Sequence, residues 1–309
     1  MTLPMNDFLR FEMPNSSDPY LEEVPSRKLD DLLPRRGGEG IRLSLMLSTF
    51  NRRSQLIRTL ETLCRQTFKE FEVLINDDGS TQDVLSAIMQ YTPYLRIQYF
   101  STQRTSWRSC PSKAFKTMLP FVRGEVIAIS HPEIMIDFGG IEFLYNGVIG
   151  NMQDREFICV TGKYPNGDAR DANYSLYRWA ALRPAFIDEP HYPFLDNVDW
   201  HSDLKNIQKM SGFLNFNALS GRTNLGTLQK TIYPWWLCGA TTRDCPIWDS
   251  LPEFLGHGII DRWLWGYREA NNFVDTISTD FMCYHQPHAR MAFAPEGELY
   301  ENNQARKIE

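Results

Sequence analysis

The sequence lacks an apolar run long enough to cross a membrane, and its first residues do not form a secretory signal. Residues 1–25 carry acidic side chains and prolines where such a signal needs a basic start and an apolar centre. These absences predict a cytoplasmic protein. Positive charge is not in excess either, because 32 Lys and Arg stand against 38 Asp and Glu, for a formal net charge of −6. This balance argues against a generally basic surface that binds nucleic acid.

Cysteine is scarce, and internal repeats and low-complexity tracts are absent. The six cysteines occur singly, without a C-x-x-C pair: Cys64, Cys110, Cys159, Cys238, Cys245 and Cys283. This spacing favours buried free thiols over a disulfide framework or a zinc cluster.

Apolar residues, in contrast, are abundant enough for a large core. Of the 309 residues, 42% are hydrophobic and 13% are aromatic, which fits one compact α/β domain with insertions. Residues 1–40 are rich in proline and charge and are predicted to be an N-terminal extension. Residues 161–234 show little periodicity, and 291–309 are predicted to be a C-terminal tail.

A strand–helix–strand unit is predicted within residues 43–83. The short apolar runs 43–47 and 71–75 are typical of strands that helices cover on both faces. Between them, apolar residues follow one face of a 3.6-residue period, which predicts a helix: Leu56, Ile57, Leu60, Leu63 and Cys64. The crossover between two such parallel strands is right-handed. Open α/β sheets bind nucleotides at the carboxyl ends of such strands, which here carry Thr49, Asn51, Asp77 and Asp78.

Strands and helices are predicted to alternate up to about residue 160. Ser80 is expected to cap a helix that contains Val84 and Met89, and Pro111 suits the first turn of the next helix. A further helix is expected after residue 137. The remaining strands are predicted at 95–100, 125–129 and 157–160.

Several separate motifs agree in order and spacing with one known family. They are Thr49-Phe50-Asn51-Arg52-Arg53, Gln66-Thr67, Phe71-Glu72-Val73 and Asn76-Asp77-Asp78-Gly79-Ser80. Together they resemble the amino-terminal half of a family 2-type glycosyltransferase with the GT-A fold. The resemblance covers residues 41–140 and returns near 235–290. It implies a Rossmann-like α/β domain over 41–290, with a mixed, mainly parallel sheet and an acceptor-side insertion. The half that binds the nucleotide-sugar would be 41–140, and the acceptor and catalytic half 141–290.

The resemblance also implies a nucleotide-sugar co-substrate, commonly a uridine diphosphate (UDP) sugar, whose base donates a hydrogen bond to Asp78. The residues implied to bind this co-substrate are Ser48, Thr49, Asn51, Arg52, Asp77, Asp78, Arg104, Arg108, Lys113, Cys238 and Gly239. Arginine can grip phosphate through two hydrogen bonds, although each basic residue here is equally compatible with a surface charge. At Gly239 a small residue would let the backbone approach the sugar.

The predicted fourth strand ends in Ser130-His131-Pro132-Glu133, where the family usually carries Asp-x-Asp. His131 and Glu133 keep the i, i+2 spacing, and imidazole with carboxylate suits Mn²⁺ or Mg²⁺. By the same resemblance His285, after an apolar run, would be the last ligand of this divalent cation. The alternative is that His131 binds a diphosphate oxygen directly, or only closes the strand, without a metal.

The base of the reaction is predicted at Asp261. The segment Gly256-His257-Gly258 followed by an amphipathic helix resembles the family's Gly-x-Gly-x-Glu-Asp, with Ile260 in place of the glutamate. An inverting transferase needs one carboxylate to accept the proton of the acceptor hydroxyl. The alternative is that Asp261 only interacts with the dipole of its helix.

The sequence therefore predicts a glycosyltransferase that moves a sugar from a UDP-sugar to a hydroxyl, with inversion and without a covalent enzyme intermediate. A transferase that modifies a nucleobase, of phage or mobile-element type, and a non-catalytic nucleotide-sugar binder remain as alternatives. The acceptor can be a glycan, a small molecule or a modified nucleobase.

Overall fold

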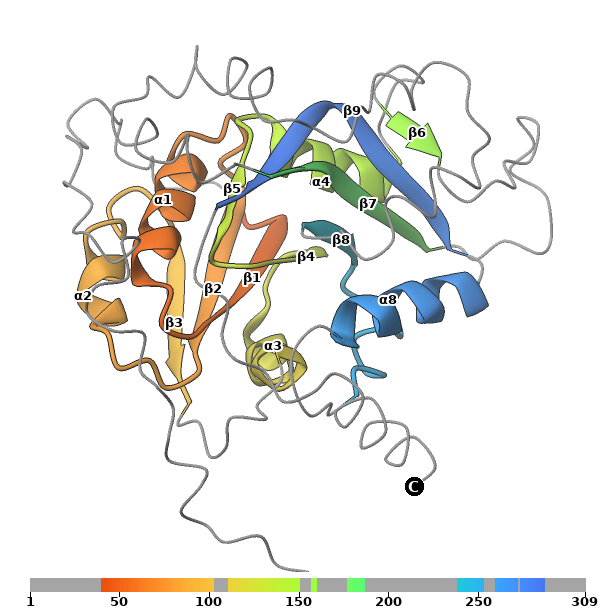
Figure 1. Cartoon of the computed structure of the whole chain (residues 1–309). Helices are drawn as coiled ribbons and strands as arrows, with labels where there is room; N and C mark the ends of the chain where they lie inside the picture. Colours follow the sequence, from red (N-terminus) through yellow and green to blue (C-terminus); the bar gives the residue numbers. More distant parts are fainter. Residues whose placement is uncertain are drawn as a thin grey trace, which may run out of the picture.

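A computed structural model of the chain describes residues 40–102, 111–150, 157–159, 177–186, 238–252, 259–271 and 273–286. In these ranges the chain forms one mixed sheet with helices on both faces (Figure 1). The strands follow the order β3-β2-β1-β4-β8-β7-β9-β5, and β6 pairs with β9. All but the last residue of the predicted extension over 1–40, the tail over 291–309 and most of 161–234 lie outside the described residues.

The strands in the first half of the sheet are parallel. This part of the chain forms β1 (Leu43–Thr49), α1 (Arg53–Cys64), β2 (Phe71–Asp77), α2 (Val84–Met89) and β3 (Ile97–Ser101). β1 lies between β2 and β4, and both pairings are parallel. The predicted strand–helix–strand unit is therefore confirmed.

The chain then crosses to the other face of the sheet and returns. This part contains α3 (Pro111–Met118), a 3₁₀ turn (Leu119–Phe121), β4 (Val126–Ser130), β5 (Ile134–Ile136) and α4 (Gly140–Ile149). α3 begins at its proline, as predicted, because a first-turn position needs no backbone N–H donor and suits the fixed φ of proline.

The second half of the sheet mixes directions. It contains β6 (Phe157–Cys159), β7 (Arg178–Phe186), β8 (Gly239–Thr242), α8 (Ile259–Ala270) and β9 (Val274–His285). β8 runs antiparallel to β4 and to β7, whereas β7 and β9 are parallel. The predicted helix and strand after residue 137 correspond to α4 and β6.

β9 has a corner. Its pairing with β7 jumps from Ala181 opposite Ile277 to Arg183 opposite Met282, so one residue of β7 faces four of β9. At this corner the Ser278 hydroxyl oxygen accepts hydrogen bonds from the backbone N of Asp280 (3.2 Å) and of Phe281 (2.7 Å). Figure 1 shows the strand bending between its two arms.

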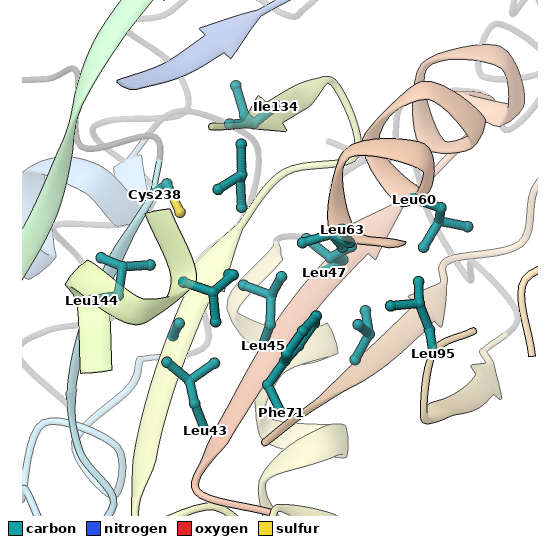
Figure 2. Close-up of a cluster of buried hydrophobic side chains, with 14 of the residues drawn as sticks. Leu43, Leu45, Leu47, Leu60, Leu63, Phe71, Leu95, Ile134, Leu144 and Cys238 are labelled. Carbon is teal, nitrogen blue, oxygen red and sulfur yellow. The ribbon is translucent and has the colours of Figure 1, made fainter. Parts of the chain in front are cut away.

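The two faces of the sheet have separate cores. Leu43, Leu45 and Leu47 of β1 pack with α1, α2 and α4, whereas Met46 packs with α3 and α8. Figure 2 shows part of the first core, including Leu47 beside Leu63 of α1. Each fully buried leucine contributes about 1.5–3 kcal/mol relative to an exposed one, so these strands are held firmly in register.

A buried carboxylate fastens the amino ends of β1 and β2. Glu72 is 0% exposed, and its Oε1 accepts hydrogen bonds from the Ser44 hydroxyl (2.7 Å) and the Arg123 backbone N (2.9 Å). Its Oε2 accepts from Arg123 Nε (2.8 Å) and Gln98 Nε2 (2.9 Å). Burial alone would raise the pKa of Glu72, but the hydrogen bonds from Arg123, Ser44 and Gln98 lower it below its usual value.

The predicted cap of α2 was wrong. Asp83, not Ser80, is the N-cap, and its carboxylate accepts a hydrogen bond from the backbone N of Ser86 at 3.0 Å. Ser80 is used elsewhere, because its hydroxyl oxygen accepts a hydrogen bond from the backbone N of Asn51. Asp and Ser are comparable caps, so this loop contact decides between them.

Cys64, Cys238, Cys245 and Cys283 are free and buried, as predicted. Cys110 and the side chain of Cys159 lie outside the description. In the described part of the chain, no helix has the length and apolar character that a membrane span requires.

Candidate functional site

The carboxyl ends of β1, β2 and β4 meet at one edge of the sheet, called here the carboxyl edge. Thr49 lies opposite Asp77 on β2, and Leu47 lies opposite Ser130 on β4. The loops that follow these strands therefore leave the sheet side by side. Ser48, predicted to contact the co-substrate, is half-buried at this edge.

Asn51 ties the loop after β1 to the loop after β2. Its φ is 50°, a left-handed conformation that asparagine tolerates better than most residues, and no other described non-glycine residue has a positive φ. Its backbone N donates to the Ser80 hydroxyl (2.9 Å), and its Oδ1 accepts from the backbone N of Thr81 (2.9 Å). The Asn51 side chain, predicted to contact the co-substrate, thus helps to fix the conformation of the loop after β2.

Asp77 and Asp78 have different surroundings. Asp77 is buried, and its two carboxylate oxygens accept hydrogen bonds from the Ser80 backbone N (2.9 Å) and the Tyr99 hydroxyl (3.0 Å). Burial and the Asp77 carboxylate raise the pKa of Tyr99, so its proton stays on the hydroxyl. Asp78 is only half-buried, and Thr102 Oγ1 lies 3.5 Å from its Oδ1. Of the two, Asp78 has the more accessible carboxylate.

Two buried polar atoms at this edge have no hydrogen-bond partner among the described residues: Thr49 Oγ1 and Asn76 Nδ2. An unsatisfied buried polar atom costs about 1–3 kcal/mol. A hydroxyl and an amide N–H can both bond to a polar ligand, so these atoms suit a site that binds one.

The basic residues near this edge are placed unevenly. Arg52 is half-buried and donates from Nη1 to the Asn51 carbonyl at 3.4 Å. Arg53 donates from Nε to the Asp83 carbonyl at 3.1 Å. Lys113 is exposed on α3, which packs on the opposite face of the sheet from α1. Arg104 and Arg108 lie outside the described residues.

The backbone brings the three predicted metal ligands into neighbouring segments. His131 and Glu133 lie between β4 and β5, and His285 pairs with Ile134. The backbone N of Gln286 donates to the Glu133 carbonyl at 2.9 Å. In the ranges that the structure describes, however, no three His, Cys, Asp or Glu side chains form a group that could hold a metal ion. The metal site at His131, Glu133 and His285 therefore stays a prediction.

The predicted base lies on α8. Asp261 is in the first turn of this helix, as expected, and its side chain lies outside the description. Ile260 and Leu264 are buried against the sheet. In the last turn, Arg268 is buried, with Nε 3.2 Å from Asp275 Oδ1 and Cζ 4.4 Å from the ring centre of Trp179.

Sequence reasoning missed this buried arginine, although a signal was present. Positions 260, 264 and 268 are spaced four residues apart and continue one helical stripe, so a charge at the third position had to be buried. A buried charge needs a partner, and Asp275 provides it. The pair fixes α8, and with it the backbone of Asp261, against β7 and β9.

Cys238 and Gly239 lie inside the core. Cys238 is 0% exposed, and burial raises the pKa of its thiol to about 12. Figure 2 shows it close to Leu144. A Cβ on Gly239 would come within 2.5 Å of Trp179 Nε1, so contact with this tryptophan already requires glycine here. Both residues were predicted to contact the co-substrate, and the structure gives each a packing role.

The segment that forms the carboxyl edge is similar to known proteins. Residues 44–142 match the sequence profile described as Glycosyl transferase family 2. We call these residues, which match that profile, the glycosyltransferase segment. The segment runs from β1 into the first turn of α4, and it contains every loop of the carboxyl edge.

Curated relatives of this glycosyltransferase segment are similar over limited lengths. The validoxylamine A glucosyltransferase of Streptomyces hygroscopicus subsp. jinggangensis is 41% identical over 68 residues, 21% of this chain and 16% of that protein. The chondroitin synthase of Escherichia coli is 30% identical over 99 residues, 32% of this chain and 14% of that protein. The glycosyltransferase GlyG of Streptococcus pneumoniae is 25% identical over 138 residues, 44% of this chain and 43% of that protein. The matches span less than half the length of each relative.

Solved structures share the fold beyond the glycosyltransferase segment. Residues 1–349 of S. aureus TarS, solved in complex with UDP-GlcNAc, superpose with a TM-score of 0.52 at 13% identity. The match covers 84% of this chain and 64% of that one. Another structure of TarS residues 1–349 gives a TM-score of 0.51 at 14% identity, over 80% of this chain and 60% of that one. The fold is the GT-A fold.

One motif of the glycosyltransferase segment is structural in this chain. Gln66 Nε2 donates to the carbonyls of Ile136 (3.2 Å) and Asp137 (2.9 Å), and its Oε1 accepts from the backbone N of Ile141 (3.1 Å). The backbone N of Thr67 donates to the Phe138 carbonyl at 3.0 Å. The Gln66-Thr67 pair therefore fastens α1 to the turn between β5 and α4.

Proposed function

We propose that this chain is a glycosyltransferase that moves a sugar from a UDP-sugar to a hydroxyl acceptor. The observation that carries the proposal is the carboxyl edge within residues 44–142, where Thr49, Asp78 and the 131–133 loop lie at neighbouring strand ends. This is the place where open α/β sheets bind nucleotides.

The nucleotide is assigned to uridine because of Asp78. Its carboxylate can accept the N–H of uracil, and the buried carboxylate of Asp77 holds the loop that presents it. A UDP-sugar is also what the TarS structure with the shared fold contains. The Thr49 hydroxyl at the end of β1, which has no hydrogen-bond partner within the described ranges, offers a further hydrogen bond to the nucleotide.

The chemistry requires a base and a stabilised leaving group. In an inverting transfer the Asp261 carboxylate accepts the proton of the acceptor hydroxyl as that oxygen attacks the anomeric carbon. The bond to the UDP oxygen breaks, and negative charge develops on the diphosphate. Arg52, close to the carboxyl edge, can balance part of that charge. A divalent cation held by His131, Glu133 and His285 stays a prediction.

The test is a calorimetric titration with UDP, GDP and ADP, each with and without Mn²⁺. We expect UDP to bind more tightly than the other two, and Asp78→Asn to lose this preference. Asp249→Asn is the matched control, because Asp249 is exposed in the turn after β8, at the opposite end of β4 from the carboxyl edge. Equal affinity for all three nucleotides would exclude the uridine assignment. Slow hydrolysis of a UDP-sugar would exclude a non-catalytic binder.

A further inference from the structure

Gln286 lies immediately after β9 and is 0% exposed. Its side-chain Nε2 donates hydrogen bonds to the Gln55 carbonyl (3.0 Å) and to Thr59 Oγ1 (3.2 Å), both on α1. Its backbone N donates to the Glu133 carbonyl at 2.9 Å. One residue therefore joins the end of β9, the helix α1 and the loop after β4.

Thr59 extends this connection to the next residue of the loop. Its hydroxyl donates to the Pro132 carbonyl at 2.7 Å. Since a hydroxyl has a single proton, Thr59 can only accept the hydrogen bond from Gln286. The donor and the acceptor of both hydrogen bonds are therefore fixed: Gln286 donates to Thr59, and Thr59 donates to Pro132. We call Gln286, Thr59 and their hydrogen bonds the clasp.

Both clasp side chains are fully buried, at positions that apolar side chains of similar size would also fill. Buried polar groups fix a geometry more narrowly than apolar contacts do, because hydrogen bonds demand a distance and a direction. The loop it holds, 131–133, follows β4 directly and lies at the carboxyl edge, next to the end of β1. The strand end it holds carries His285, which pairs with Ile134.

We propose that Gln286 and Thr59 are positioning residues for the nucleotide-sugar site. The clasp sets the positions of the 131–133 loop and of the last residues of β9 relative to α1, so that both segments lie under the diphosphate. The proposal rests on the proposed function. Neither side chain touches the co-substrate, because both act through the backbone of the loop and of the strand end.

The test compares variants that remove only the hydrogen-bonding groups. Thr59→Val and Gln286→Met keep side-chain size but break the clasp. We expect each to weaken UDP binding about 10- to 100-fold, since small displacements of a binding group have effects of this size. The double variant should be no weaker than the worse single variant, because both changes break the same connection. Thr59→Ser keeps the hydroxyl and should bind UDP like the parent protein.

Thr62→Val is the matched control for stability. Thr62 lies on the same helix and is equally buried; its hydroxyl accepts a hydrogen bond from the Ile136 backbone N at 3.1 Å and donates to the Thr59 carbonyl at 2.8 Å, not to the Thr59 side chain. It should lower the melting temperature about as much as Thr59→Val while leaving UDP affinity unchanged. Parental UDP affinity in both clasp variants, or an equal loss in Thr62→Val, would overturn the role of the clasp alone. A parent protein that binds no nucleotide would overturn the proposed function and the clasp's role with it.

Discussion

At the scale of single residues, the two aspartates at the carboxyl end of β2 have different roles. Asp77 is buried and uses both carboxylate oxygens to hold the Ser80 backbone and the Tyr99 hydroxyl. Asp78 is half-buried and is held through its backbone N, which donates to the Thr49 carbonyl at 2.9 Å. The first residue shapes the loop, so the second can present its carboxylate to a ligand.

The proposed base gives the clearest prediction for catalysis. Asp261→Asn keeps the size of the side chain but removes a proton acceptor, so turnover should fall by roughly 10²- to 10⁴-fold. UDP affinity should stay within a few-fold, and stability should change by only about 0.3–1 kcal/mol, the contribution of a carboxylate in a helix first turn. Steady-state kinetics and calorimetry measure the two effects separately.

The control for this substitution is Asp244→Asn, which removes an exposed carboxylate in the turn after β8. It should leave turnover unchanged. Near-normal turnover in Asp261→Asn would place the base elsewhere and would favour a retaining mechanism.

The predicted cation makes Glu133 a second test residue. Glu133→Ala should lose the part of UDP affinity that depends on Mn²⁺, and a chelator added to the parent protein should have the same effect. The substitution spares the Glu133 carbonyl, which accepts the hydrogen bond from Gln286, so the clasp remains. Calorimetry with Mn²⁺ and with chelator measures both. If neither changes UDP binding, His131, Glu133 and His285 bind no cation, and basic residues neutralise the diphosphate.

Single site residues could be predicted from sequence only where a motif marks them. Asp78 belongs to a loop motif, and its position at a strand end is confirmed. Gly239 and Cys238 were assigned by resemblance, and that assignment stays a prediction; the residues that pack around them, such as Trp179 against Gly239, are far away in the sequence. Arg268 belongs to no motif and shows its role only once Asp275 lies beside it.

At the scale of elements, the amino ends of β1 and β2 should show a pH-dependent stability. Because the folded pKa of Glu72 lies below its unfolded value, ionised Glu72 stabilises the fold above the unfolded value, about 4.3. This contribution is lost as the pH falls through the folded pKa. Glu72→Gln should lower the free energy of unfolding by about 1–3 kcal/mol at pH 7, and the difference from the parent should shrink in strongly acidic solution.

Urea unfolding of both proteins at pH 7 and in acid measures this difference. Glu70→Gln is the control, because the Glu70 carboxylate forms an exposed ion pair, 3.6 Å from Arg42, and such pairs contribute about 0–1 kcal/mol. A difference between parent and Glu72→Gln that does not depend on pH would show that the Glu72 charge does not stabilise the fold.

Elements could be predicted where their own pattern determines them. The strands β1 and β2 are short apolar runs, and α1 has a clear apolar face, so local sequence defines all three. The cap of α2 could not be predicted, because Asn51, 29 residues earlier, binds Ser80. The arrangement of β7, β8 and β9 was also out of reach, since contacts such as Thr276 with Trp179 join residues 97 positions apart.

At the scale of the whole molecule, one sheet joins the half that carries Asp78 to the half that carries Asp261. β4 is the junction, with parallel β1 on one side and antiparallel β8 on the other. β9 connects the two chemical regions: its second residue is Asp275, the partner of Arg268, and it ends at His285, next to the clasp. Each end of this strand is fixed by a buried polar contact.

The corner in β9 determines which face of the sheet each side chain of its second arm points to. Residues 278–281 interrupt the ladder with β7, so the alternation of side chains restarts at Met282. From there Cys283 packs into one core while Met282 does not belong to it. Because successive strand residues point to opposite faces, one residue more or fewer at the corner would exchange these two directions. Cys283 would leave its core, and the Gln286 side chain would point away from α1. The length of this four-residue bend thus determines which side chains at the end of β9 point toward the proposed co-substrate.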